Sequence, residues 1–209
     1  MIYSILTILF SYFLGSIPTA VWIGKFFYKI DIREHGSGNS GSTNTFRVLG
    51  IPPGIIVLLI DILKGFFAVH LVYFKSYKPN TDAFITFSIV LGIVAVLGHI
   101  FPIYAKFKGG KGVATLLGVV FAIHTAAAFM TLPIFLIVLL ISRYVSLSSM
   151  VSGIAFPILL IFFFETKALS LIIFSISISI LLIITHKKNI LRIINRTESK
   201  ANLFNTKKK

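Results

Sequence analysis

The chain contains no cysteine and few acidic residues: six Asp and Glu stand against 20 Lys and Arg. Without cysteine there is no disulfide, no thiol nucleophile and no Cys-based metal site. The scarcity of carboxylates also leaves little material for a mechanism based on paired acids, and no Asp-rich motif of the kind that binds Mg²⁺ is present. We therefore expect neither a metal ion nor a cofactor.

What the chain does have is an excess of apolar residues, which make up 56% of it. Several apolar runs are long enough to cross a bilayer. The net charge of +14 would indicate a nucleic-acid partner in a soluble protein. In a membrane protein, however, Lys and Arg collect in cytoplasmic loops, where they also meet anionic lipid. We predict an all-α, polytopic transmembrane helix bundle that contacts lipid and binds no nucleic acid.

The apolar runs predict the spans, which cover residues 2–27, 54–74, 83–101, 113–141, 151–164 and 169–185. The first run has no small-x-small cleavage site followed by soluble sequence, so we interpret it as a retained span. The run 113–141 exceeds the length of one helix of about 20 residues, and His124 and Pro133 interrupt it, so we divide it into two short helices. The result is about seven spans in a single integral-membrane domain, residues 1–209.

The positive-inside rule predicts the orientation. An odd number of spans puts the N-terminus outside and the C-terminus, with a basic tail over about residues 187–209, in the cytoplasm. The outside loops then keep only Lys75, Lys78 and Lys167. The cytoplasmic segments hold Lys25, Lys29, Arg33, Arg47, Lys106, Lys108, Lys111, Arg143, Lys187, Lys188, Arg192, Arg196, Lys200 and Lys207–Lys209. A six-span arrangement would place the 106–111 cluster and the tail on opposite faces, which fits worse.

A polar, glycine-rich loop, GSGNSGSTNTFR at residues 36–47, lies between two apolar segments on the predicted cytoplasmic side. Backbone N–H groups freed by glycine, hydroxyl donors and a guanidinium group converge readily on a phosphate. A flexible linker is the alternative, but a linker rarely contains two Asn, two Thr and an Arg. The candidate ligands are Ser37, Asn39, Thr43, Asn44 and Arg47.

A second cluster starts at His99 and continues through KFKGGKGVAT at residues 106–115. Glycines just before an apolar helix leave its first N–H groups open to an anion, and the lysines add full positive charges. This is not a Walker P-loop, because Ala105 stands where the first glycine would be and no strand precedes it. His99 orients a ligand or simply ends a helix by bonding to backbone. The candidate ligands are His99, Lys108, Gly109, Gly110, Lys111 and Gly112.

A third cluster, HKKNILR at residues 186–192, follows the last span. His186 and Asn189 share a face of a helix because they are three residues apart, and we interpret both as functional. The neighbouring lysines are better explained as a basic flank that ends the span. In the predicted turn at 143–149, Ser146 and Ser148 are possible phosphate donors or, equally, helix caps.

Asp61 and Lys64 are ionisable residues within the second span. Such groups are costly in a membrane unless they are paired or face a polar cavity. We expect them to pair with each other or with residues of the clusters.

Three anion-binding clusters on one face predict a substrate with more than one phosphate, handled at the bilayer interface. Acyl transfer and phosphoryl transfer both fit. No His is followed five positions later by Asp, so the His-x4-Asp acyltransferase dyad is absent. A transporter or channel for phosphate-bearing metabolites is the alternative from another class. Against it, the spans show no obvious inverted repeat, and the polar groups lie at one membrane face.

At these residues the chain closely resembles the bacterial acyl-phosphate-dependent glycerol-3-phosphate acyltransferases of the inner membrane. The matching motifs are GSGNSGSTNTFRVLG at 36–50, GHIFPIYAKFKGGKGVAT at 98–115 and HKKNILRIINRTESK at 186–200. Two shorter segments, DILKG at 61–65 and RYVSLSS at 143–149, also resemble the family. One departure stands in the third motif, where Arg196 occupies a position at which the family usually has Gly before Thr-Glu.

The resemblance implies transfer of a fatty acyl group from acyl phosphate to the 1-hydroxyl of glycerol 3-phosphate, giving lysophosphatidic acid and phosphate for phospholipid synthesis. It further implies a multi-pass protein of the bacterial inner membrane whose active site faces the cytoplasm, supplied by an upstream acyl-phosphate-forming enzyme. Arg47 and Lys111 would stabilise phosphate charge, with His186 and Asn189 as the other catalytic residues. The proton of the hydroxyl goes either to His186 as general base or to an oxygen of acyl phosphate, and the resemblance favours the second route.

Overall fold

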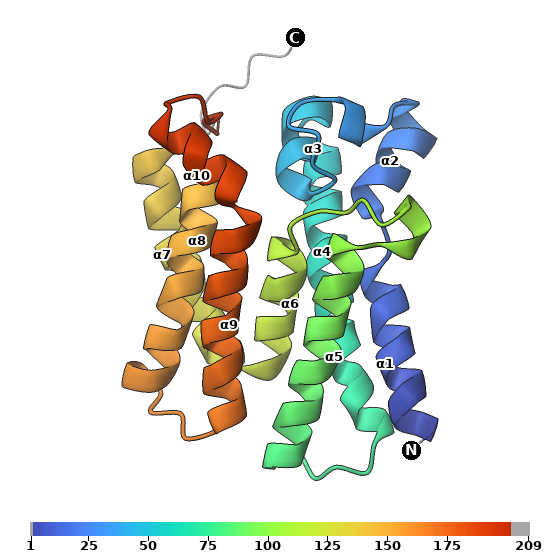
Figure 1. Ribbon diagram of the computed structural model, residues 1–209, viewed down its shortest axis with the longest axis vertical. Helices are drawn as coiled ribbons and strands as arrows, with labels where there is room; N and C mark the ends of the chain where they lie inside the picture. Colours follow the sequence, from blue (N-terminus) through green and yellow to red (C-terminus); the bar gives the residue numbers. More distant parts are fainter. Residues whose placement is uncertain (1, 202–209) are drawn as a thin grey trace. The chain divides into compact units, whose positions relative to one another are not determined.

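The computed structural model describes residues 2–201, and within them the chain forms helices and no strand (Figure 1). The chain divides into two compact units, Met1–Thr125 and Ala126–Lys209, which are described one by one. The end of the predicted basic tail, including Lys207–Lys209, lies outside the described residues.

The first unit contains α1 (Ile2–Gly15), α2 (Thr19–Tyr28), η1 (Ile32–Glu34), α3 (Ser42–Leu49), α4 (Ile51–His70), η2 (Leu71–Phe74), α5 (Asp82–Ile100), η3 (Ile103–Ala105) and α6 (Val113–Ile123). The second unit contains α7 (Thr125–Ser142), α8 (Val145–Ile158), the π-helical η4 (Leu159–Phe163), α9 (Leu169–Thr185) and α10 (Lys187–Ile194).

Four helical segments within residues 2–201 are long and apolar enough to cross a membrane, namely Ile51–Phe74, Asp82–Ala105, Thr125–Ser142 and Val145–Phe163. Up to six qualify if two bent pairs are each counted as one span: α1 with α2, bent by 44°, and α9 with α10, bent by 58°. The apolar helix α6 is shorter, with 11 residues. The predicted all-α polytopic bundle is confirmed; the number of spans and the orientation of the termini stay predictions.

The division of the run 113–141 is confirmed at His124, because α6 ends before this residue and α7 begins at Thr125. Pro133 does not interrupt the run, since it lies inside the 18-residue helix α7. The first run, by contrast, is not one continuous helix. It breaks at Pro18, which lacks the backbone N–H that a helix interior needs, so α1 ends at Gly15 and α2 begins at Thr19. The break frees the carbonyl oxygen of Ile17, which accepts a hydrogen bond of 2.9 Å from Nζ of Lys64.

Small residues let the helices of the first unit pack closely. The two helices α4 and α6 lie side by side (Figure 1), and a side chain at Gly65 or Gly118 would overlap the backbone of the other helix. The same holds for Gly15 of α1 against α5. Since lipid supplies no hydrophobic force between helices, this close contact is a main source of their association.

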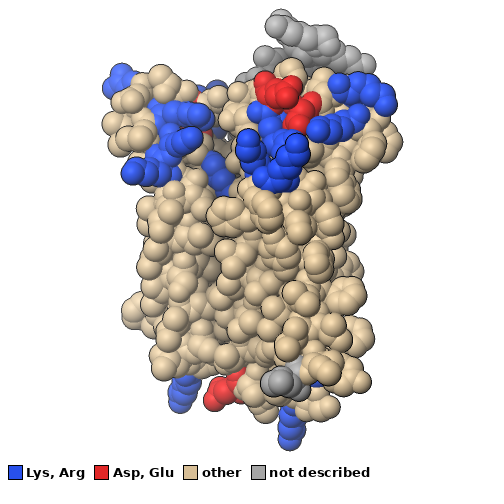
Figure 2. All heavy atoms as spheres, turned by 45° about the vertical axis from the view of Figure 1, so that its right-hand side comes forward, with Lys and Arg blue, Asp and Glu red and all other residues tan. Residues whose placement is uncertain are grey.

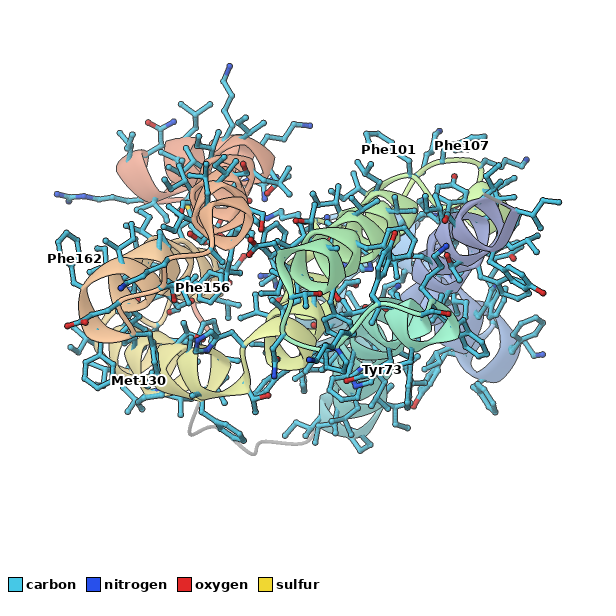
Figure 3. The ribbon with its side chains drawn as sticks, turned by 90° about the horizontal axis from the view of Figure 1, so that it is seen from below. Tyr73, Phe101, Phe107, Met130, Phe156 and Phe162 are labelled. Atoms are coloured by element: carbon cyan, nitrogen blue, oxygen red, sulfur yellow. The ribbon has the colours of Figure 1, made fainter. Side chains whose placement is uncertain are left out.

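In the second unit α8 packs along α9. Phe156 points in among the helices and is 2% exposed, whereas Phe162 points away from them and is 77% exposed (Figure 3). The hydroxyl of Ser179 donates to the carbonyl oxygen of Gly153 at 2.8 Å, which ties the two helices together. Outward-facing aromatic and aliphatic residues are expected on a helix that contacts lipid.

Candidate active site

The first glycine-rich loop is folded around the side chain of Asn44. This residue lies in α3 and is 1% exposed. Its Nδ2 donates to the carbonyl oxygens of Ile32 and His35, each at 3.0 Å. Its Oδ1 accepts hydrogen bonds from the backbone N–H and the hydroxyl of Ser37, at 2.8 and 3.1 Å. Gly36, at φ +61°, passes so close that a side chain there would overlap this amide oxygen. Asn44 therefore fixes the path of the loop.

An ion pair just before this loop joins it to the second cluster. Asp31 caps η1 and accepts hydrogen bonds from Nε and Nη2 of Arg33, while Nζ of Lys25 lies 3.1 Å away. Nη1 of Arg33 donates to the carbonyl oxygen of Ala105 at 3.0 Å. The hydrogen-bonded guanidinium lowers the pKa of Asp31 far below its usual range, and the carboxylate raises the pKa of Arg33. Both groups therefore stay charged, and Arg33 links the two loops.

The glycine segment of the second cluster packs on the end of α5. Gly109 N–H donates to the carbonyl oxygen of Ile100 at 3.1 Å, and Gly110 N–H donates to that of His99 at 3.2 Å. A side chain at Gly110 would overlap the His99 ring. The segment then turns through Gly112, at φ +80°, into the first turn of α6. The predicted arrangement of glycines immediately before a helix N-terminus is thus present in the structure.

The two glycine-rich loops meet at one small pocket in the first unit. It encloses about 180 Å³ of space not filled by protein atoms, its open mouth included. The lining residues are Ile17, Pro18, Thr19, Ser40, Asp61, Lys64, His99, Pro102, Gly109 and Gly110. Asp61 and Lys64 form the predicted pair, with Nζ and Oδ1 2.8 Å apart. Ser40 of the first loop and Gly109–Gly110 of the second therefore share a polar concavity.

The third cluster lies in the second unit, where His186 occupies the bend between α9 and α10. Its side chain is 3% exposed, and Nδ1 lies 2.8 Å from the carbonyl oxygen of Leu182. Because a carbonyl oxygen only accepts, Nδ1 carries the proton of the neutral ring. Nε2 of His186 is then the acceptor nitrogen.

Glu198 connects the other polar residues of this unit. Its Oε1 accepts a hydrogen bond of 2.6 Å from Nδ2 of Asn189 and one of 2.9 Å from the hydroxyl of Ser146. The carboxylate thereby joins the α10 segment to α8 and orients the Asn189 amide.

Ser146 and Ser148 lie inside α8 and not in a turn, because α8 begins at Val145. The alternative that they cap this helix is wrong, since Tyr144 holds the N-cap position and makes no side-chain capping bond. Ser148 donates instead to the carbonyl oxygen of Tyr144 at 2.9 Å.

The chain after α10 turns in a Schellman motif, and Arg196 occupies its glycine position. Arg196 N–H donates to the carbonyl oxygen of Ile193 at 3.0 Å, and Thr197 N–H donates to that of Arg192 at 2.8 Å. This pattern needs a left-handed residue, usually Gly, and Arg196 has φ +57°. The backbone therefore keeps the shape that a family glycine would favour, although a Cβ is present.

We predict that Arg196→Gly stabilises this turn. The left-handed conformation costs an L-residue about 1–2 kcal/mol. Glycine avoids this cost but loses about 0.5–1 kcal/mol more in chain entropy on folding, so the net gain is up to about 1.5 kcal/mol. Hydrogen exchange at the amides of Thr197 and Glu198 measures the effect. Asn195→Gly is the matched control, because Asn195 has φ −80° and should gain nothing. Equal protection in both variants would contradict the explanation.

The predicted site residues differ in how far water reaches them. Exposed are Ser37, Thr43, Arg47 and Lys108; partly buried are Asn39, Gly109, Gly110, Lys111 and Asn189; buried are Asn44, His99, Gly112, Ser146, Ser148 and His186. Within residues 2–201, no three His, Asp or Glu side chains gather closely enough to hold a metal ion. The union of all three clusters in one pocket stays a prediction.

Sequence patterns gave no site role to Asp31 or Arg33 and did not reveal the bonds of Glu198 to Asn189 and Ser146. The alternating charges of Asp31, Arg33 and Glu34 were the available signal for an ion pair before the loop. No local pattern predicts that Glu198 accepts a hydrogen bond from Ser146, because 52 residues separate them.

Comparisons with known proteins agree with this architecture. The family model described as glycerol-3-phosphate acyltransferase matches residues 5–196. Glycerol-3-phosphate acyltransferase 2 of Bacillus anthracis is 47% identical over 197 residues, which are 94% of this chain and 98% of that protein. A glycerol-3-phosphate acyltransferase of Listeria monocytogenes is 46% identical over 196 residues, covering 94% and 96% of the two chains.

Comparison with solved structures also finds glycerol 3-phosphate acyltransferases. The crystal structure of PlsY (YgiH), an integral membrane glycerol 3-phosphate acyltransferase, in its glycerol 3-phosphate form superposes with a TM-score of 0.85 at 36% identity, covering 97% of this chain and 96% of that one. Its lysophosphatidic acid form gives 0.81 at 36% identity, with 94% of both chains covered. The helices and polar loops thus define a multi-pass membrane acyltransferase. The chain belongs to the glycerol-3-phosphate acyltransferase family.

Proposed function

We propose that this acyltransferase moves a fatty acyl group from acyl phosphate to the 1-hydroxyl of glycerol 3-phosphate. The observation that carries the proposal is the meeting of two glycine-rich, cation-bearing loops at one pocket in a member of this family. Both substrates of such a reaction carry phosphate, and glycine N–H groups with nearby cations are a general means of binding it.

In the proposed step the 1-hydroxyl oxygen attacks the carbonyl carbon of acyl phosphate. A new C–O ester bond forms, the bond between the acyl carbon and the phosphate oxygen breaks, and the products are lysophosphatidic acid and inorganic phosphate. Acyl phosphate is a mixed anhydride, so phosphate leaves easily once its charge is balanced. Arg47, Lys108 and Lys111 would supply that balance, and the loop donors Ser37, Asn39 and Thr43 would hold the phosphates in place.

The proton of the attacking hydroxyl goes, in our proposal, to an oxygen of the departing phosphate. His186 then binds substrate, with Nδ1 fixed by Leu182 and Nε2 facing a donor such as a hydroxyl. Asn189, oriented by Glu198, would act beside it. The competing route makes Nε2 of His186 the general base.

We predict that His186→Gln raises KM while keeping much of kcat. The Gln side chain keeps a polar atom near the Nε2 position but cannot act as a base. Loss of a base costs about 10²–10⁴-fold in kcat, whereas loss of one binding contact changes mainly KM. Steady-state kinetics with both substrates separate the two routes. A kcat lowered more than about hundredfold at unchanged KM would establish the histidine as base.

The proposed site faces the cytoplasm of the bacterial cell at its inner membrane. In the face shown in Figure 2, Lys and Arg lie at helix ends and the sides of the helices are free of charge. The positive-inside rule assigns the richer ends to the cytoplasm. Because acyl phosphate is a reactive anhydride, an upstream enzyme must form it close to its point of use.

Phosphate release from purified protein tests the proposal. Release should require both acyl phosphate and glycerol 3-phosphate, and lysophosphatidic acid should appear in equal amount. An acyl thioester in place of acyl phosphate is the control and should give no product. Turnover with the thioester alone would refute the donor assignment, and uptake into liposomes without turnover would indicate a transporter.

A further inference from the structure

Asp61 and Lys64 place a pair of charges inside the membrane-spanning part of α4. They are 1% and 3% exposed, and Nζ lies 2.8 Å from Oδ1. Ionisable residues at such depth are expensive and usually serve a function. Part of that function is structural, because Lys64 bonds to Ile17 and the Thr19 hydroxyl donates to Asp61 at 3.0 Å. These two bonds close the break between α1 and α2.

The other side of the pair faces His99 of α5. Nδ1 of His99 lies 3.8 Å from Oδ1 of Asp61, too far for a hydrogen bond. The ring is 6% exposed, and Nδ1 has no hydrogen-bond partner among residues 2–201. A buried ring nitrogen without a partner is unusual and calls for an explanation. The carboxylate still acts on the ring by its charge, which is little screened in a buried site.

His99 in turn supports the glycine segment. Its carbonyl oxygen accepts the Gly110 N–H, and its ring fills the place that a side chain at position 110 would need. Gly109 is blocked in the same way by the His99 carbonyl oxygen. Neither glycine adopts the left-handed conformation. Glycine is therefore required here because His99 is close and not because of the backbone angles.

We propose that the Asp61–Lys64 pair and His99 form a positioning network for the Gly109–Gly110 segment. Asp61 orients the ring, and the ring sets how far the segment lies from Ser40 across the pocket. His99 is on this view a positioning residue that acts through the glycines, without touching the reacting atoms. The inference rests on the proposed function only where it takes the segment to bind substrate phosphate.

A rescue experiment tests the contact between the ring and the segment. His99→Asn keeps a polar atom near the Nδ1 position but removes the ring edge, so KM for at least one phosphorylated substrate should rise about tenfold with kcat changed less than about twofold. Gly110→Ala should lower kcat/KM about hundredfold, because its methyl group displaces the segment. Combining the two should recover about tenfold, since the colliding ring is gone. A double variant no better than Gly110→Ala would overturn the proposal.

A neutral replacement tests the role of the charged pair. Asp61→Asn with Lys64→Met leaves no unpaired buried charge, so the protein should fold. It should raise KM as His99→Asn does. Ser11→Ala is the matched control, because it removes a buried α1–α5 hydrogen bond to Leu91 that is remote from the pocket. Its thermal midpoint in detergent should fall without a change in KM. If the variant with Asp61→Asn and Lys64→Met also loses thermal stability without a change in KM, the proposal is overturned.

Binding of glycerol 3-phosphate, measured by titration calorimetry, separates this inference from the donor assignment. If wild-type protein gives no turnover with acyl phosphate, the proposed donor is wrong. The same variants should nevertheless weaken glycerol 3-phosphate binding about tenfold if the network positions the segment that holds it. Unchanged binding combined with unchanged KM in active protein would overturn the positioning role.

Discussion

Lys111→Met is expected to lower kcat/KM by about 10²–10³-fold, the usual cost of losing one preorganised group that stabilises developing charge. Lys111 follows the Gly109–Gly110 segment directly and precedes the turn into α6. It is only partly exposed, so its charge is less screened than that of a surface lysine. The methionine keeps most of the aliphatic length and removes only the charge. Phosphate release at saturating and limiting substrate measures the effect.

Lys106→Met is the matched control, because Lys106 belongs to the same loop and is exposed. If the lysines act only by drawing anions toward a basic surface, the two variants should lose similar activity, and added salt should remove the difference. We expect instead that Lys106→Met changes kcat/KM by less than about twofold. Equal losses would contradict a specific role of Lys111.

Sequence patterns were sufficient to predict most of the helices, because a long apolar run in lipid forms a helix, which satisfies its own backbone hydrogen bonds. The division near His124 followed from the length of the run and from the residues that interrupt it, whereas length could not reveal the break at Pro18. One continuous run of apolar residues suggested one helix, yet the Ile17 carbonyl finds its partner in Lys64, 47 residues away. Such a long-range partner makes a break tolerable inside a membrane.

At the candidate site, residue type predicted which residues belong to the polar loops. It did not predict what each side chain does there. Asn44 and Ser37 carry similar polar groups in one loop, but the structure buries the first and exposes the second. Burial depends on the η1 turn that packs over α3, and no local spacing encodes it. Arg196 is a different case, since the sequence showed its mismatch with the family glycine but not that the backbone keeps the left-handed conformation, at φ +57°.

Asn44→Leu is expected to unfold the first glycine-rich loop and to lower kcat/KM by about hundredfold or more, because a displacement of about 1 Å in a positioning group has this effect. The leucine has similar size but removes all four hydrogen bonds of the amide. It leaves the Ser37 N–H and two carbonyl oxygens beside an apolar side chain. Each hydrogen bond contributes about 0.5–1.5 kcal/mol, so the loss of four should cost the loop about 2 kcal/mol or more of local stability. Hydrogen exchange across residues 36–41 reports this loss independently of activity.

Thr45→Val provides the control, because Thr45 is the neighbouring fully buried residue of α3 and its hydroxyl makes one bond to the Gly41 carbonyl oxygen at 3.1 Å. Losing a single hydrogen bond should cost about 1 kcal/mol and leave kcat/KM within about threefold of wild type. If Asn44 instead binds substrate directly, Asn44→Leu should raise KM while exchange in the loop stays slow. Fast exchange together with lost activity is the result that the four hydrogen bonds predict, since the loop must be folded before Ser37 and Ser40 can face a phosphate.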